Sequence, residues 1–179
     1  MQTSTVTPKS RMKNPAMIVP EAMAPLQALG QLPGQLRGAP ARALALAQIR
    51  VSQINGCALC LGGSFKTLRG AGESEDRLFA VSAWRESSRF TAAERAALAL
   101  AESMTRFNDR SDPVPDAVWD DAARRFPERE LAIMVLGIAS MNLYNRVNVT
   151  TQQVAAEWSG DNSEVKAQKA SHEAVKGSA

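Results

Sequence analysis

The sequence is short of the residues and runs on which several classes of protein depend. Its 179 residues include only two cysteines and one histidine. A four-ligand metal site is disfavoured, because no second Cys pair and no His-x-His motif complete a ligand set. No uninterrupted apolar run approaches the roughly 20 residues that cross a bilayer, and the N-terminus lacks the apolar core of a secretory signal peptide. We expect a cytoplasmic protein with no metal and no membrane partner.

Aromatic residues and runs of β-branched residues are also scarce. Aromatic side chains make up 5% of the chain, and alanine and leucine dominate it, a balance that favours helices over strands. The length suits one domain with a proper core. Because no internal repeat and no strand pattern is present, the sequence predicts an all-α protein built as a bundle of several helices.

Acidic residues are missing from the front of the chain, and this absence explains its basic balance. The formal net charge is +3, which equals the contribution of Lys9, Arg11 and Lys13. From residue 14 onward the charges balance, so we expect no nucleic-acid partner. The composition divides the chain into three parts: a flexible arm (1–14), a helical domain (15–158) and a polar tail (159–179).

Hydrophobic periodicity and capping residues predict where the helices lie. The clearest apolar period runs from Ala41 to Ile54. Thr91 and Glu94 form a capping box ahead of another helix. The segment 131–144 is apolar nearly all round, which predicts the most buried helix of the fold. Further helices are expected at 21–29, from the cysteines to Arg69, after Ser74 and around Val118 to Phe126, with a loop over 30–40 and an extension of the last helix toward Trp158.

The stretch from Asn55 to Ser64 carries the most reactive chemistry, because it holds both cysteines as Cys57-x-x-Cys60. A thiol at a helix start faces unpaired backbone N–H groups, which can lower its pKa from about 8.5 to roughly 3.5–7.5. The i, i+3 spacing places both sulfurs on one face, near enough to join. A redox pair is one interpretation of the motif; two small buried apolar side chains and half of a metal site are the alternatives.

Two adjacent glycines, Gly62 and Gly63, follow the second cysteine. Inside a helix each costs about 1 kcal/mol relative to alanine. They either loosen the helix or make room for a ligand or a neighbouring helix, and the sequence leaves both interpretations open.

Several co-linear segments resemble the carboxymuconolactone decarboxylase family, and in particular its AhpD-like alkylhydroperoxidase branch. The likeness covers roughly residues 14–158. The segments are 50–61 (RVSQINGCALCL), 70–73 (GAGE), 78–86 (LFAVSAWRE), 90–100 (FTAAERAALAL), 113–119 (PVPDAVW) and 142–146 (NLYNR).

This resemblance implies an AhpD-like helical bundle that assembles into homotrimers or homohexamers and reduces hydroperoxides. It implies that Cys60 is the peroxidatic thiolate, which becomes a sulfenic acid, and that Cys57 resolves it as a disulfide. It also implies an external dithiol or lipoyl-type electron donor and no resident cofactor.

The chain departs from the family pattern at the proton relay. The family places a Glu twelve residues before the first cysteine and a His four residues after the second; these positions are Ala45 and Ser64 here. Such acid–base help is typically worth about 10²–10⁴-fold. The single histidine, His172, lies in the predicted tail and is a poor replacement. Ser64 can hydrogen-bond a thiolate, and Glu86 could supply a carboxylate or could be a solvated helix end.

Three hypotheses for the function follow. The first is thiol-dependent hydroperoxide reduction, an alkylhydroperoxidase-like oxidoreductase weakened by the missing relay. The second is a non-catalytic or redox-regulatory helical oligomer of the same family. The third is decarboxylation of a carboxylated muconolactone, which the loss of the histidine disfavours because an anionic substrate needs a proton donor and cationic groups.

Overall fold

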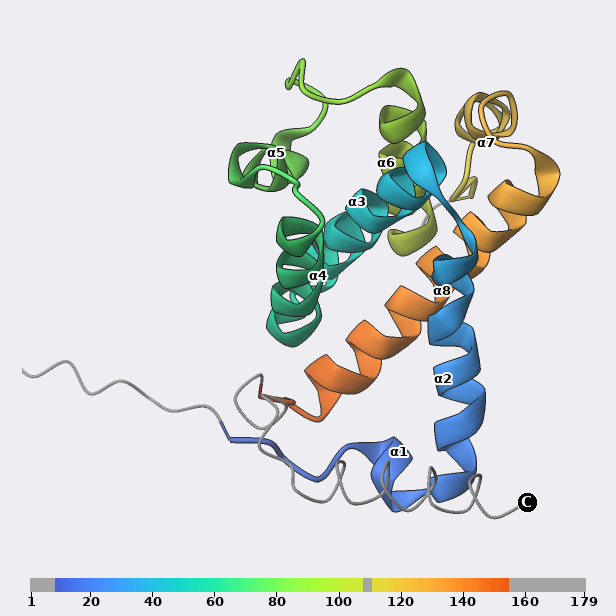
Figure 1. Ribbon diagram of the computed structural model, residues 1–179. Helices are drawn as coiled ribbons and strands as arrows, with labels where there is room; N and C mark the ends of the chain where they lie inside the picture. Colours follow the sequence, from blue (N-terminus) through green and yellow to red (C-terminus); the bar gives the residue numbers. More distant parts are fainter. Residues whose placement is uncertain (1–8, 108–110, 155–179) are drawn as a thin grey trace, which may run out of the picture.

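The computed structural model describes residues 9–107 and 111–154. In these ranges the chain forms eight α-helices and three short 3-10 helices without a strand, which confirms the all-α prediction. The elements, in chain order, are α1 (Pro15–Ile18), η1 (Pro20–Ala22), α2 (Met23–Gln31), η2 (Leu32–Gln35), α3 (Gly38–Asn55), α4 (Ala58–Gly70), α5 (Glu75–Ala80), η3 (Val81–Ala83), α6 (Ala92–Thr105), α7 (Asp116–Ala123) and α8 (Glu128–Thr150) (Figure 1).

Helix α3 lies at the centre of the bundle and is buried on two faces. The predicted face, which includes Leu44 and Val51, packs in a core shared with α6, α7 and α8. A second face, with Leu46 and Ile49, packs in a separate core beside α4, α5 and η3. Figure 1 shows α4 and α5 on one side of α3 and α7 and α8 on the other. Because the cysteine segment follows the C-terminal end of α3 directly, the packing of α3 fixes the position of that segment in the bundle.

A buried carboxylate ties α6 to α3 and to the segment after η3. Glu102 is 5% exposed and accepts hydrogen bonds from Arg50 Nε (2.6 Å), Trp84 Nε1 (3.1 Å) and Arg85 Nη1. Burial raises the pKa of Glu102, but the hydrogen bonds from its three donors and the charge of Arg50 outweigh that effect. The pKa therefore lies below its ordinary value of 4.5, and the group stays ionised at neutral pH.

Helix α8 is not the most buried helix, contrary to the prediction. It buries eight of its 23 residues, whereas α6 buries nine of its 14. Leu136 and Leu143, seven residues apart, are 45% and 39% exposed. They share their face with Ala132 and Ala139, which are also exposed, so an apolar stripe runs along α8. Neither α8 nor any other helix in the described part of the chain combines the length and hydropathy that crossing a bilayer requires.

Most predicted helix boundaries hold, and the exceptions lie around residues 30–40 and at the end of α8. The capping box at Thr91 and Glu94 is confirmed, as is the Ser74 cap of α5. The predicted loop over 30–40 instead contains η2 and the start of α3. Helix α8 ends at Thr150, so it does not extend through Val147 to Trp158, which lies outside the described residues.

The start of the described chain is bonded to the end of α8. The Arg11 backbone N–H donates to the Thr151 carbonyl (2.9 Å), and Gln153 Nε2 donates to the Met12 carbonyl (2.9 Å). Asn14 Oδ1 then caps α1 by accepting from the Ala16 N–H (2.9 Å). Residues 9–14 of the predicted arm are thus held beside α8, and residues 1–8 and the predicted tail lie outside the described ranges. These bonds place α1 near the cysteine motif.

A close approach between α3 and α8 depends on Gly137. A Cβ atom added there would lie 2.9 Å from Leu44 Cδ2, and Leu44 is itself buried in the core. We expect Gly137→Ala to lower the free energy of unfolding by about 1–3 kcal/mol through overpacking. Gly62→Ala is the control, because a Cβ there meets nothing within 4 Å; it should raise stability by up to about 1 kcal/mol. Urea titration of both variants tests the contrast, and equal effects would contradict it.

Candidate active site

The backbone turns sharply between α3 and α4 and presents the cysteines at a helix start. Gly56 ends α3 in the left-handed region (φ 69°), where its N–H caps the helix by donating to the Gln53 carbonyl. Glycine takes this conformation without steric cost. Cys57 is then the N-cap of α4, and its Sγ accepts the Cys60 backbone N–H (3.3 Å). The predicted position of the motif at a helix N-terminus is confirmed.

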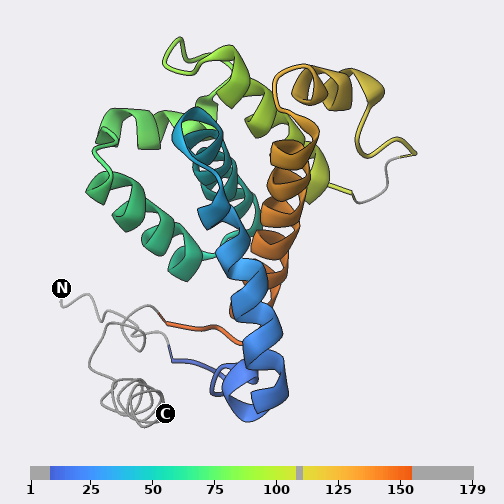
Figure 2. The ribbon, with the colours of Figure 1, turned by 45° about the vertical axis from the view of Figure 1, so that its right-hand side comes forward.

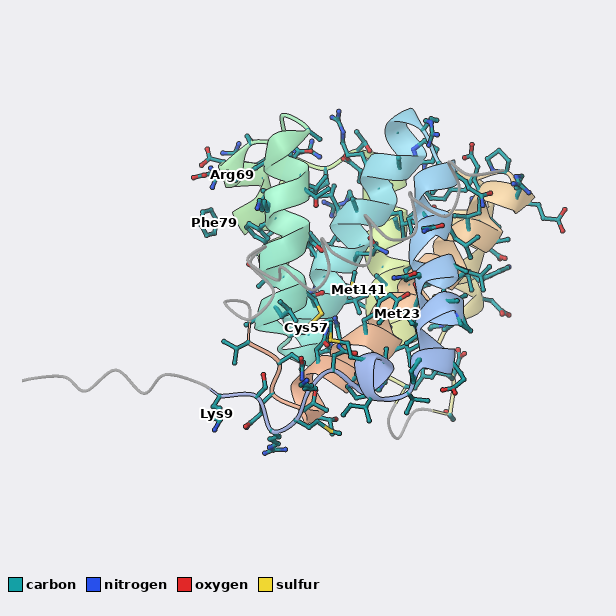
Figure 3. The ribbon with its side chains drawn as sticks, turned by 60° about the horizontal axis from the view of Figure 1, so that its bottom comes forward. Lys9, Met23, Cys57, Arg69, Phe79 and Met141 are labelled. Carbon is teal, nitrogen blue, oxygen red and sulfur yellow. A yellow bond between two sulfur atoms is a disulfide. The ribbon has the colours of Figure 1, made fainter. Side chains whose placement is uncertain are left out.

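The two sulfurs are joined as a disulfide, with Cα atoms 5.4 Å apart. The prediction that the spacing brings them within bonding distance is therefore confirmed. Their surroundings differ, because Cys57 is 2% exposed whereas Cys60 is half-buried. Figure 3 shows the disulfide as a yellow bond, with Met23 and Met141 labelled beside it. Cys60 is therefore the more accessible of the two cysteines.

Cys60 lines a cavity of about 700 Å³. Its walls come from α1, α2, α3, α4 and α8, and Figure 2 shows the N-terminal helices and α8 on the same side of the bundle. The described residues that line it are mostly apolar, and none of them carries a charge. Its residues are Asn14, Ala16, Met17, Met23, Leu26, Gln27, Gly30, Ala45, Gln48, Leu59, Cys60, Gly63, Ser64, Thr67, Leu68, Met141, Tyr144, Val147 and Asn148.

The structure brings the two lost relay positions to this cavity. Ala45 on α3 and Ser64 on α4 both line it together with Cys60. Gln48 lines it as well, although its Nε2 donates to the Gly137 carbonyl (3.2 Å). Glu86 does not reach the cavity; it is exposed in the turn after η3. No carboxylate or histidine therefore takes over the relay among the described residues of the lining.

The paired glycines do not loosen α4, which is continuous from Ala58 to Gly70. A Cβ atom at either position meets no other atom within 4 Å. Gly63 lines the cavity beside Cys60, whereas Gly62 lies on the opposite side, against a groove with Phe65 and Phe79. No neighbouring helix in the described residues therefore requires the lack of a side chain at either position, and at Gly63 the open space is part of the cavity.

The contact between Cys60 and Asn148 was missed in the sequence. Asn148 on α8 donates from Nδ2 to Cys60 Sγ across 3.3 Å. A signal was present, because Asn142, Asn145 and Asn148 recur every three residues along an apolar helix. Such spacing puts them near one face, where buried amides need partners.

A second residue of the lining ties the N-terminal helices to α8. Tyr144 Oη donates to the Leu26 carbonyl of α2 (2.6 Å), and burial raises the pKa of its hydroxyl. Within the described residues no group of three or more His, Cys, Asp or Glu side chains is placed to hold a metal ion.

Buried amides fix the register between the cysteine turn and α8. Asn55, the last residue of α3, donates from Nδ2 to Asn142 Oδ1 (2.9 Å) and Asn145 Oδ1 (3.1 Å). Asn142 in turn donates to Thr105 Oγ1 on α6 (3.2 Å), and Asn145 to Ser52 Oγ on α3 (3.4 Å). Both asparagines of α8 are buried. The network holds the turn that begins the motif against the helix that carries Asn148.

Comparison with known sequences points to one family. A sequence model of the carboxymuconolactone decarboxylase family matches residues 20–103. An uncharacterized protein, YdfG of Bacillus subtilis (strain 168), is 34% identical over 111 residues, which span 62% of this chain and 74% of YdfG. The family match includes the cysteine motif and both helices that flank it.

Comparison with solved structures gives the same fold. ATU0492 of Agrobacterium tumefaciens, a protein of unknown function named as a candidate antioxidant defence protein AhpD, aligns with a TM-score of 0.73 at 30% identity. The alignment covers 82% of this chain and 97% of ATU0492. The debrominase Bmp8 aligns with a TM-score of 0.64 at 19% identity, over 77% of this chain and 73% of Bmp8, and this similarity shows the fold alone.

Proposed function

Because the chain belongs to the carboxymuconolactone decarboxylase family, we propose that it reduces hydroperoxides through Cys57 and Cys60. The observation that carries this proposal is the disulfide at the start of α4, in which half-buried Cys60 faces a cavity and Cys57 is buried behind it. This asymmetry suits Cys60 as the attacking sulfur and Cys57 as the resolving one.

The proposed reaction proceeds in three balanced steps. The Cys60 thiolate attacks the outer oxygen of the hydroperoxide, the O–O bond breaks, and the alcohol leaves after taking up a proton. Cys60 is then a sulfenic acid. The Cys57 thiol attacks that sulfur, water leaves, and the disulfide forms. An external dithiol finally reduces the disulfide through a mixed disulfide and is itself oxidised.

The cavity supports an apolar organic hydroperoxide as the substrate, since none of the described residues that line it has a charge to pair with an anion. The same absence disfavours the alternative of muconolactone decarboxylation, whose substrate is anionic. For the electron donor we propose an external dithiol of lipoyl type, with no resident cofactor.

The proposed turnover is slow because Ala45 and Ser64 cannot move protons at the site. Neither side chain is a base at neutral pH. The redox-regulatory oligomer is the second candidate, and this missing relay is the observation in its favour.

We also propose that the protein works as a homotrimer or homohexamer. The apolar stripe of Leu136 and Leu143 on α8 supports assembly, because contiguous exposed apolar surface is typical of protein contacts.

A single-turnover assay tests the function. Fully reduced protein, mixed with cumene hydroperoxide, should consume an equivalent amount of peroxide and form the Cys57–Cys60 disulfide. Cys57→Ser should instead stop at a sulfenic acid on Cys60, detected by dimedone labelling and mass spectrometry. Cys60→Ser should consume no peroxide above buffer. Peroxide consumption that persists in Cys60→Ser would overturn the proposal. A disulfide that forms with oxidised glutathione as the oxidant, but not with the hydroperoxide, would favour the redox-regulatory candidate.

A further inference from the structure

Asn148 is the side chain that the structure places on the sulfur of Cys60. Its Nδ2 lies 3.3 Å from Sγ, within hydrogen-bond reach of a sulfur acceptor. The helix N-terminus supplies its donor to the other sulfur, since the Cys60 N–H points to Cys57 Sγ. Gln48, the amide side chain that α3 contributes to the cavity, donates to the Gly137 backbone carbonyl instead. The two sulfurs thus have different donors, and the donor to Cys60 comes from α8.

We propose that Asn148 is a catalytic residue that stabilises the reduced Cys60 sulfur by donating a hydrogen bond to it. The inference rests on the proposed function, in which Cys60 attacks. In the family, a Glu and a His at the positions of Ala45 and Ser64 assist the attacking sulfur. The proposal assigns part of that task to the Asn148 amide on α8. Asn148 stabilises the negative charge and does not move a proton, so it does not replace the whole relay.

The hydrogen bond strengthens when the disulfide is reduced. Reduction by a dithiol adds two electrons and one proton to the S–S bond, leaving a thiolate on Cys60 and a thiol on Cys57. Hydrogen bonds to an ionised acceptor are about twice as strong as those between neutral groups. Asn148 therefore stabilises the thiolate more than either neutral form of the sulfur. The difference from the thiol lowers the pKa of Cys60, and the difference from the disulfide makes the disulfide easier to reduce.

None of the described lining residues has a charge that would compete with this hydrogen bond in setting the pKa of Cys60. Among the described residues, α1, α2, α3, α4 and α8 present no charged side chain to the cavity, and Tyr144 is the titratable group that they place there besides Cys60. Burial raises the pKa of Tyr144, so it stays neutral at the pH values where a thiol titrates. The backbone that carries this side chain is held in place, because the Asn148 backbone carbonyl accepts the Gln153 backbone N–H (2.9 Å) and Asn145, three residues earlier, accepts a hydrogen bond from Asn55.

The test is the pKa of Cys60, measured from the pH dependence of iodoacetamide alkylation in a Cys57→Ser background. Asn148→Leu should raise this pKa by about one unit, which corresponds to roughly a tenfold shift in the thiol–thiolate equilibrium. Asn148→Asp keeps the shape, removes the donor and adds a negative charge, so it should raise the pKa further. Gln48→Leu is the matched control, since it removes an amide from the same cavity without touching sulfur; it should leave the pKa unchanged.

An unchanged pKa in folded Asn148→Asp would overturn the proposal, and so would an equal rise in Gln48→Leu. If Asn148→Leu fails to fold, the isosteric Asp variant still decides the question. The readout needs no peroxide, so it separates this inference from the proposed function. A raised pKa in the Asn148 variants, combined with no peroxide consumption by the native pair, would support the role of Asn148 and reject the peroxidase.

Discussion

Replacing Ala45 with glutamate and Ser64 with histidine together should raise hydroperoxide turnover by about 10²–10⁴-fold. Both positions line the cavity that contains Cys60, so the new side chains would face the reacting sulfur from α3 and from α4. The imidazole would take the thiol proton and return it to the leaving alcohol, and the carboxylate would hold the imidazole in the productive tautomer. The measurement is kcat/KM for cumene hydroperoxide with a dithiol donor.

The control variants show whether a rate gain comes from the Glu–His pair acting together or from any added imidazole. Ala45→Glu and Ser64→His alone should each gain less than the pair, because groups that act as a unit have non-additive effects. Thr67→His puts an imidazole on the same helix and in the same cavity, one turn beyond Ser64, and should gain little. An unchanged rate in the folded double variant would show that the pocket no longer supports this chemistry.

Removing the charge of Glu102 should lower the free energy of unfolding by about 3–5 kcal/mol, the usual loss when one member of a buried ion pair is taken away. Glu102→Gln is nearly isosteric, so it leaves the packing intact and Arg50 without its counter-charge. Arg50 has a side chain only 14% exposed and cannot recover full hydration, whereas Arg85, at 56%, can turn to water. Guanidinium titration measures the loss.

Glu75→Gln is the matched control, because the Glu75–Arg69 pair is 63% and 62% exposed and should contribute no more than about 1 kcal/mol.

The pH dependence of the free energy of unfolding is a second measurement of the role of Glu102. The pKa of Glu102 is lowered in the folded protein, so its contribution is complete above its ordinary value of 4.5 and is lost as pH falls below that value. The Gln variant should lose this part of the acid sensitivity, and a loss of stability equal to that of Glu75→Gln would contradict the role given to Glu102.

The local parts of the fold could be predicted from the sequence. The capping box at Thr91, the helix start at the cysteines and the apolar face of α3 each depend on residues a few positions apart, and the structure confirms them. Burial was harder to predict. The segment 131–144 is apolar on all sides, but apolar periodicity does not say whether a face meets its own chain, solvent or another subunit. For this reason the exposure of Leu136 and Leu143 was missed.

The site was predictable only as far as its motif. The resemblance to the family, read from the cysteine motif, located the relay positions at Ala45 and Ser64, and both reach the cavity. The other wall was not predictable, because Asn148 meets Cys60 across 88 positions of sequence. That contact depends on the register that the buried asparagines impose between α3 and α8. Glu86 was a candidate for the site but does not reach the cavity. It follows Trp84, a residue of the core beside α4, α5 and η3, yet its own side chain is exposed.

Helix α2 is the wall of the cavity with the least buried surface of its own. This helix buries none of its nine residues, although Leu26 and Met23 face the space beside Cys60. Segments with few buried apolar contacts open at a small fraction of the free energy of global unfolding. We therefore expect α2 to open locally while both cores stay intact, a step that breaks the hydrogen bond from Tyr144 to Leu26.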